Sequence, residues 1–143
     1  MSFLDDVTDQ LNLRWAWEKV RRASTPGDVW IDEIELAGFE VQLERNLQSI
    51  AAEIRKGRYR IRPLRPMAFP KNPNKDGKQQ VRQYVNVAVR DQVAWTAVVN
   101  VIGPHLDPLM PAWSYGNRLF RSIWVDEENG THRRKIGWYR HST

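Results

Sequence analysis

Residues 71–92 read KNPNKDGKQQVRQYVNVAVRDQ, and this stretch decides what kind of fold the chain adopts. Its first part, through the Asp76-Gly77 pair, carries the Asn, Pro and Gly residues typical of a tight turn. Valines and Tyr84 then recur in a pattern that favours a strand from about Gln79 to Ala88. An Arg-Asp pair at residues 90 and 91 precedes a helical pattern. The stretch therefore predicts the turn and the returning strand of a basic β-hairpin.

The residues before this turn supply the other side of the hairpin. Tyr59 and Ile61 alternate with arginines between residues 58 and 62, and Pro63 and Pro66 follow. Because proline has no N–H to donate to a sheet, this part is expected to be an irregular extended segment or an edge strand. The predicted hairpin spans about residues 58–88.

Helical periodicity frames the hairpin on both sides. Apolar residues recur every three or four positions from Phe39 to Ile54, and Gly57 stands where a helix C-terminus favours glycine. A further helix is expected at about residues 7–23, and another at about 89–102 that Gly103-Pro104 should end. Residues 105–124 are expected to form loop and short helix, and residues 135–139 a short strand. The chain is thus predicted to be a single α+β domain over residues 1–143, with its first helices within about 7–56.

Charge is distributed unevenly along the 143 residues. The net charge is +5, and 11 of the 17 acids lie at or before Glu53. By contrast, 11 of the 22 lysines and arginines lie between Arg55 and Arg90, beside the single acid Asp76. Such segregation is expected where one face of a protein meets a polyanion, although a merely solvated basic surface would give the same pattern.

Other classes of site and environment receive little support from the composition. The chain has no cysteine, which removes disulfides and thiolate metal sites. His105, His132 and His141 have no metal-ligand spacing, so no metal site is predicted. No apolar run approaches the roughly 20 residues of a membrane span, and no basic leader follows Met1. A soluble, cytoplasmic protein without a membrane partner is expected.

Several short motifs, taken in their order, resemble the N-terminal fingers region of reverse transcriptases of the bacterial group II intron type. The family has a G-x-Y segment after a helix, a P-K dipeptide, a G-K turn, an arginine nine residues before the Asp of an R-D pair, and an S-Y-G-x-R element. The matching residues here are Gly57, Tyr59, Pro70, Lys71, Gly77, Lys78, Arg82, Arg90, Asp91, Ser114, Tyr115, Gly116 and Arg118. The resemblance covers roughly Leu13 to Ser122, most of the chain.

The resemblance implies an α+β fingers subdomain of a right-hand polymerase that binds nucleic acid and nucleotide. It assigns the triphosphate of an incoming dNTP to Lys71 or Lys78 and to Arg82. It places Tyr115, Gly116 and Arg118, the core of the element at residues 114–118, near the template strand. A series of arginines, Arg58, Arg60, Arg62 and Arg65, is in addition suited to contact with phosphate backbones. The implied partners are an RNA template and a DNA primer.

Some of these residues have simpler interpretations. Arg82 is equally placed to be a surface partner across the hairpin, and Tyr115 and Arg118 to pack within the fold. Asp91 opens a helix, where it favours the helix dipole and can cap amides, and this structural role explains it alone. Lys75 has no counterpart in the family pattern and is expected to be an ordinary turn residue.

The chain also departs from the family. Arg82-Gln83-Tyr84 stands where Arg-Pro-Leu is frequent, and Leu119-Phe120-Arg121 where a further Gly-Arg is frequent, which indicates a divergent branch such as the defence-associated or retron-like enzymes. A complete enzyme of this kind needs Mg²⁺ held by carboxylates of a palm, including a Tyr-x-Asp-Asp turn. That turn is missing from the sequence, and Asp126 is expected in an acidic loop outside any alternating strand.

The chain alone is therefore expected not to catalyse polymerisation and to need no cofactor, and a palm-containing chain is a further expected partner. Two alternatives stay open. One is a non-catalytic module that binds RNA or single strands and derives from a reverse transcriptase. The other is an unrelated basic domain that binds a protein.

Overall fold

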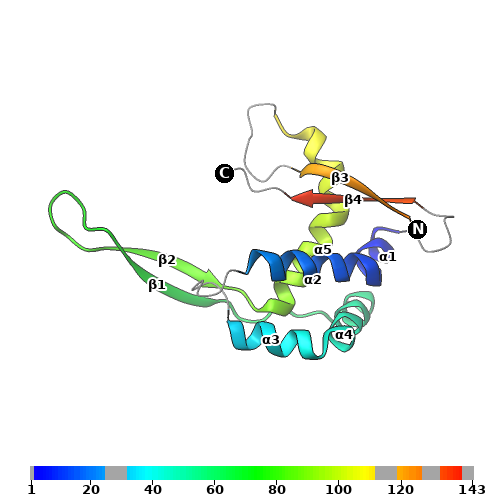
Figure 1. Cartoon of the computed structure of the whole chain (residues 1–143), viewed down its shortest axis with the longest axis horizontal. Helices are drawn as coiled ribbons and strands as arrows, with labels where there is room; N and C mark the ends of the chain where they lie inside the picture. The colour runs from blue at the N-terminus through cyan, green and yellow to red at the C-terminus, as the bar shows by residue number, and fades with distance from the viewer. Residues whose placement is uncertain (1, 25–31, 112–118, 127–132, 140–143) are drawn as a thin grey trace.

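The computed structural model describes residues 2–24, 32–111, 119–126 and 133–139, the last two ranges as backbone only. It has an α+β architecture in which helices form the body and a long hairpin projects from it (Figure 1). The order of elements is α1 Phe3–Val7, α2 Gln10–Ala23, α3 Glu33–Val41, α4 Leu43–Arg55, β1 Arg65–Lys71, β2 Gln80–Asn86, α5 Val89–Leu106, the 3₁₀ turn η1 Asp107–Leu109, β3 Leu119–Asp126 and β4 Arg133–Tyr139.

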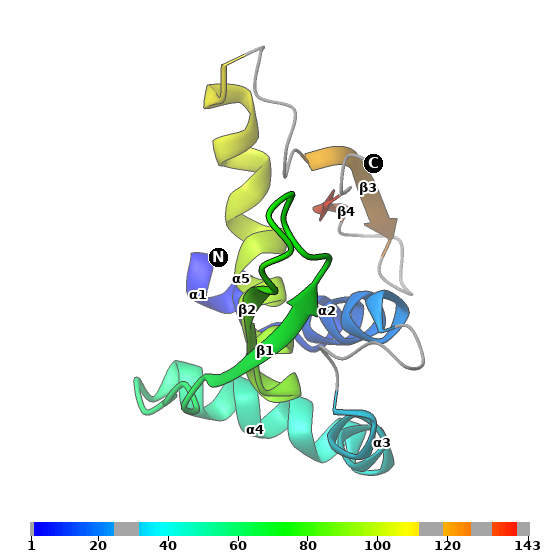
Figure 2. The same ribbon diagram turned by 90° about the vertical axis from the view of Figure 1, so that its left-hand side faces the viewer.

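The hydrophobic core lies among the helices. Leu13 and Trp17 of α2, Leu47 and Ile50 of α4, and Val93 of α5 are almost completely buried. Each set recurs at helical spacing, so each helix turns one apolar stripe inward. None of the described core residues belongs to β1 or β2. The hairpin therefore projects from the helical body (Figure 1). Figure 2 looks at the molecule from the side on which the hairpin lies.

The helix predicted at about residues 7–23 starts later, at Gln10, after a short helix that was not predicted, and the helix predicted from the stripe at residues 39–54 is interrupted. Asp9 accepts hydrogen bonds from the amides of Leu11 and Asn12, so α2 starts there and α1 ends before it. Likewise, Gln42 leaves the helical conformation between α3 and α4. The apolar spacing does not reveal the break between α3 and α4, because the step from Phe39 to Leu43 keeps the helical period across it.

The remaining boundaries confirm part of the prediction and correct part of it. The returning strand is Gln80–Asn86, close to the prediction, whereas β1 begins only at Arg65 and residues 58–64 form no strand. The expected stop at Gly103-Pro104 is wrong, because α5 continues to Leu106 with Pro104 inside it. A proline there removes one backbone hydrogen bond near the helix end, where the loss is small.

The C-terminal part contains a strand that was not foreseen. Residues 119–126, expected as loop, form β3 and pair antiparallel with β4, the element predicted at residues 135–139. Asp126 is therefore the last residue of a strand, which corrects the prediction that it lies in an acidic loop outside any strand. This second two-stranded sheet lies against α5 (Figure 1).

Candidate nucleic-acid interface

The turn of the hairpin is built around Asn74. Its side-chain oxygen accepts hydrogen bonds from the amides of Asp76 and Lys78 at 3.1 and 2.8 Å. The backbone amide of Asn74 donates to the Lys78 carbonyl at 3.0 Å. Gly77 adopts a φ of 73°, a conformation that favours glycine. These bonds give the turn a defined shape, and Lys71 and Lys78 lie at its two ends.

Strand register divides the hairpin into two faces. Arg82 lies opposite Phe69, Tyr84 opposite Met67, and Lys71 pairs with Gln80. Directly opposed residues of an antiparallel pair project to the same side, and so do residues two apart. Consequently one face combines the two predicted triphosphate contacts Lys71 and Arg82 with two aromatic rings.

The aromatic rings on this face were not among the predicted site residues. The rings of Phe69 and Tyr84 lie 5.8 Å apart in a tilted arrangement, and the Arg82 guanidinium donates to the Tyr84 hydroxyl at 3.3 Å. Alternation of residue type along β2 and the register together place them there, but the register is not visible in the sequence. The opposite face carries Pro66, Ala68, Pro70, Val81 and Val85, all of which are exposed.

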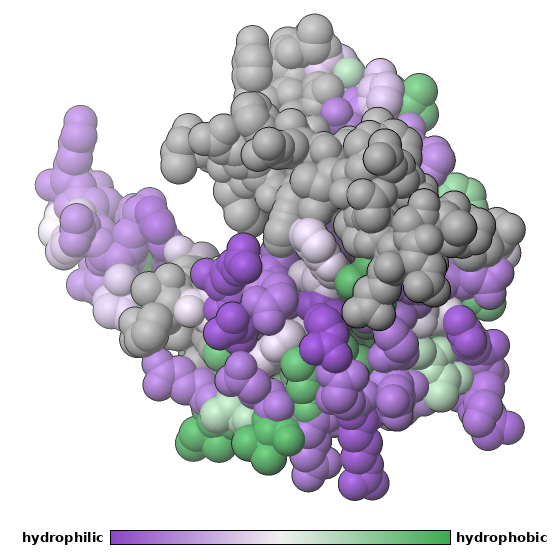
Figure 3. Space-filling view, turned by 45° about the vertical axis from the view of Figure 1, so that its right-hand side comes forward, coloured by the Kyte–Doolittle hydropathy of each residue, from purple (hydrophilic) through white to green (hydrophobic). Residues whose placement is uncertain are grey.

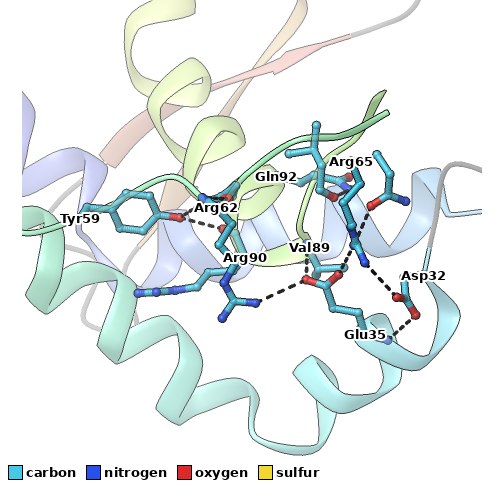
Figure 4. A network of polar contacts seen from close by, with 11 residues as sticks. Asp32, Glu35, Tyr59, Arg62, Arg65, Val89, Arg90 and Gln92 are labelled. Atoms are coloured by element: carbon cyan, nitrogen blue, oxygen red, sulfur yellow. Dashed lines mark hydrogen bonds and ion pairs between the residues drawn. The ribbon is translucent and has the colours of Figure 1, made fainter. Parts of the chain in front are cut away.

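The root of the hairpin is held by acids of α3. Arg65 donates to Glu35 at 2.9 Å, to Asp32 at 3.4 Å and to its cross-strand neighbour Asn86 at 2.7 Å. The other Glu35 oxygen accepts the amide of Val89 at 2.8 Å (Figure 4). Ala88 offers no capping side chain to α5, so Glu35 supplies the acceptor for its first amide. A hydrogen bond from the Glu35 amide and the Arg65 charge lower the pKa of Asp32.

A second anchor lies at Asp91. This carboxylate is completely buried and accepts the Tyr59 hydroxyl at 2.6 Å and the Arg62 amide at 2.9 Å. Burial, with the bond to Asp91, raises the pKa of Tyr59 well above its ordinary value, so the phenol keeps its proton and donates. Asp91 therefore has a structural role, as predicted, but it does not cap its own helix: the amide that it accepts belongs to the segment before the hairpin.

Arg90, the other residue of the R-D pair, also makes contacts within the fold. Its guanidinium lies 2.7 Å from Glu53 of α4 and 5.0 Å from the centre of the Tyr59 ring. The ion pair with Arg90 is the main reason why the pKa of Glu53 is lowered. Arg90 thus links α4, the Tyr59 segment and α5.

The nine cations from Arg58 to Arg90 fall into two groups. Arg62, whose guanidinium is 4.0 Å from Glu35, Arg65 and Arg90 all lie within ion-pair distance of acids. In the part of the chain that the structure describes, no carboxylate lies within that distance of the others, which are all exposed: Arg58, Arg60, Lys71, Lys75, Lys78 and Arg82. Figure 3 shows the projecting hairpin as a largely hydrophilic surface.

Several predicted residues cannot be placed. Tyr115, Gly116 and Arg118 lie outside the described residues. Among those that are described, no group of three or more His, Cys, Asp or Glu side chains is arranged to hold a metal ion. No helix in the described ranges is long and apolar enough to cross a membrane.

Comparison with known proteins adds no family assignment. The chain matches no protein-family model, and no curated protein is significantly similar to it. Any functional conclusion therefore rests on the motifs and on the geometry described above.

Proposed function

We propose that the chain is the fingers part of a reverse transcriptase, an RNA-directed DNA polymerase, and that its hairpin binds nucleic acid and the nucleotide triphosphate. The observation that carries the proposal is the division of the cations. Acids neutralise the arginines at the hairpin root, whereas the cations towards the tip and in the segment before β1 have no acid within ion-pair distance among the described residues. A surface that merely aids solubility has no need for this arrangement.

Each exposed cation has a chemical role suited to its side chain. Arg82 presents a planar fork that can donate two hydrogen bonds to one phosphate, whereas Lys71 and Lys78 act as point charges. These residues meet the triphosphate of the nucleotide, and Phe69 and Tyr84 on the same face offer rings for stacking on a base. Arg58 and Arg60 are assigned to the phosphate backbone.

Arg62 has a smaller share in this proposal. Its amide is bound to Asp91 and its guanidinium lies 4.0 Å from Glu35, so its main role is to hold the segment before β1. The proposed template contacts Tyr115, Gly116 and Arg118 follow from the resemblance alone. RNA template, DNA primer, a palm-containing chain and Mg²⁺ complete the proposed enzyme.

Salt dependence of RNA binding tests the proposal. On single strands the logarithm of affinity falls with the logarithm of salt by roughly 0.7 per phosphate neutralised. Replacing Arg58 and Arg60 together with Gln should therefore reduce the slope by about 1.4, measured by fluorescence anisotropy with a labelled single-stranded RNA. Arg65→Gln is the matched control, because this arginine is bound to Glu35 and Asp32, and its slope should remain that of the unmodified chain. An affinity that does not change with salt would contradict the proposal.

A further inference from the structure

Three elements meet in a pocket at the root of the hairpin, on its apolar face. The pocket has a volume of about 410 Å³. Its lining residues come from the end of α2, the end of β2 and the start of α5, three segments that come together in Figure 1. Its lining residues are Val20, Ala23, Ser24, Val85, Val87, Gln92, Trp95 and Thr96. In each element they lie at the spacing of one face, three or four apart in the helices and two apart along the strand. The volume is within the roughly 300–1,000 Å³ typical of small-molecule sites.

The lining of this pocket is uncharged and includes one aromatic ring. It has no charged side chain, so it offers nothing to neutralise a phosphate. It does have the Trp95 indole, whose residue is 40% exposed, between aliphatic walls. An aromatic face beside apolar side chains is the arrangement that holds a flat heteroaromatic ring.

Polar groups are present at the same place. The Gln92 amide nitrogen donates to the Val87 carbonyl at 2.8 Å, which orients the amide within the first turn of α5. The Ser24 hydroxyl donates to the Val20 carbonyl at 2.8 Å, so its lone pairs remain to accept. With the Thr96 hydroxyl, these groups can meet the donors and acceptors on the edge of a base.

Positive charge lies close to the pocket, in the last turn of α2. Arg21 and Arg22 immediately precede the lining residues Ala23 and Ser24, and the two share one acid, Glu18, at 3.0 and 3.9 Å. A neutral interior with cations outside it complements a nucleotide, whose ring is neutral and whose phosphate is anionic.

We infer that this pocket holds one unstacked base of a single-stranded nucleic acid, against the Trp95 ring. The inference rests on the proposed function, because it takes the bound polyanion to be a nucleic acid. It adds a site on the hairpin face opposite Lys71 and Arg82, where neither the motifs nor the resemblance places a contact.

The test compares strands with and without bases on the unmodified chain and on Trp95→Ala. An abasic single-stranded DNA keeps its phosphates and sugars but loses every base, so it should bind more weakly than oligodeoxyadenylate. Loss of one stacked base corresponds to roughly a 5- to 100-fold change in affinity. We therefore expect the ratio of the two affinities to fall by about that factor in Trp95→Ala, with an unchanged salt slope.

Two further variants keep the result independent of folding. Ala23→Leu fills the pocket from the exposed end of α2 and should reduce the same ratio, whereas Ile34→Ala, at an exposed apolar side chain of α3, should not. Thermal melting verifies that each variant is folded. If the ratio is the same in all chains while binding stays dependent on salt, the pocket does not hold a base and the proposed function survives. If the unmodified chain binds neither strand, both proposals are wrong.

Discussion

Asp91 illustrates how one buried side chain can hold the segment that leads into the hairpin. Its carboxylate is inaccessible to solvent and receives two hydrogen bonds from residues about thirty positions earlier in the chain. A buried carboxylate is costly unless such donors compensate it, and each bond to a charged group contributes about 1.5–3 kcal/mol. The R-D pair is therefore explained by the fold, whether or not the chain binds nucleic acid.

Removal of this carboxylate should be expensive. Asp91→Ala leaves the Tyr59 hydroxyl and the Arg62 amide without their acceptor, and we expect a loss of about 3 kcal/mol in the free energy of unfolding. Tyr59→Phe, which removes one of the two bonds, should cost about half as much. Urea denaturation monitored by circular dichroism measures both. Equal stability of Asp91→Ala and the unmodified chain would show that the pair of bonds contributes nothing.

At the scale of the elements, the hairpin is fixed by a helix that is not adjacent to it in sequence. Glu35 of α3 binds both Arg65, the first residue of β1, and the first amide of α5. One side chain, 21% exposed, thus connects the two ends of the hairpin region to the helical body.

Glu35→Ala should loosen the root of the hairpin. The lost acceptor for the Val89 amide and the lost pairing with Arg65 should together lower stability by about 2 kcal/mol. Amide hydrogen exchange should accelerate at residues 65–67 and 84–89 and change less in the turn, which Asn74 holds independently. Glu40→Ala, at an exposed position of the same helix, is the control. Uniform acceleration along the whole hairpin would argue against an anchor at its root.

Sequence patterns predicted the elements of this hairpin but not its contacts. Turn chemistry around Asp76-Gly77 and the alternation along β2 are local, and so the hairpin and α5 were foreseen to within a few residues at most ends. Which arginines are neutralised depends on acids far away in sequence: Arg65 meets Asp32 and Glu35, and Arg90 meets Glu53. Within the predicted phosphate series, Arg62 and Arg65 lie within ion-pair distance of acids, whereas no such distance is found for Arg58 and Arg60 among the described residues. The pocket beside Trp95 was missed for the same reason, because three separate elements line it.

In the whole molecule, acids from the N-terminal half pair with only some of the cations in the basic stretch. The acidic N-terminal half supplies Asp32, Glu35 and Glu53, which neutralise arginines of the basic stretch where that stretch joins the helices. Towards the hairpin tip no such partner is found among the described residues, and the positive field remains available to a polyanion. The pKa of Asp32 is lowered mainly by the hydrogen bond from the Glu35 amide and then by Arg65, and the pKa of Glu53 mainly by Arg90. The attachment should therefore weaken only as the pH falls below their ordinary values of 3.8 and 4.5.

The whole chain should nevertheless be unable to extend a primer. Phosphoryl transfer with two Mg²⁺ ions roughly 4 Å apart needs several carboxylates around the metals, and the 143 residues contain no Tyr-x-Asp-Asp turn. Asp126 ends a strand, as a palm aspartate would, but one strand-borne carboxylate cannot hold both ions. With Mg²⁺, dNTPs and a primed RNA template, a denaturing gel should therefore reveal no extended primer, and Asp126→Asn should behave identically. Incorporation that persists through purification and is lost in Asp126→Asn would mean that this chain assembles a catalytic centre of its own, and the assignment of a separate palm would have to be abandoned.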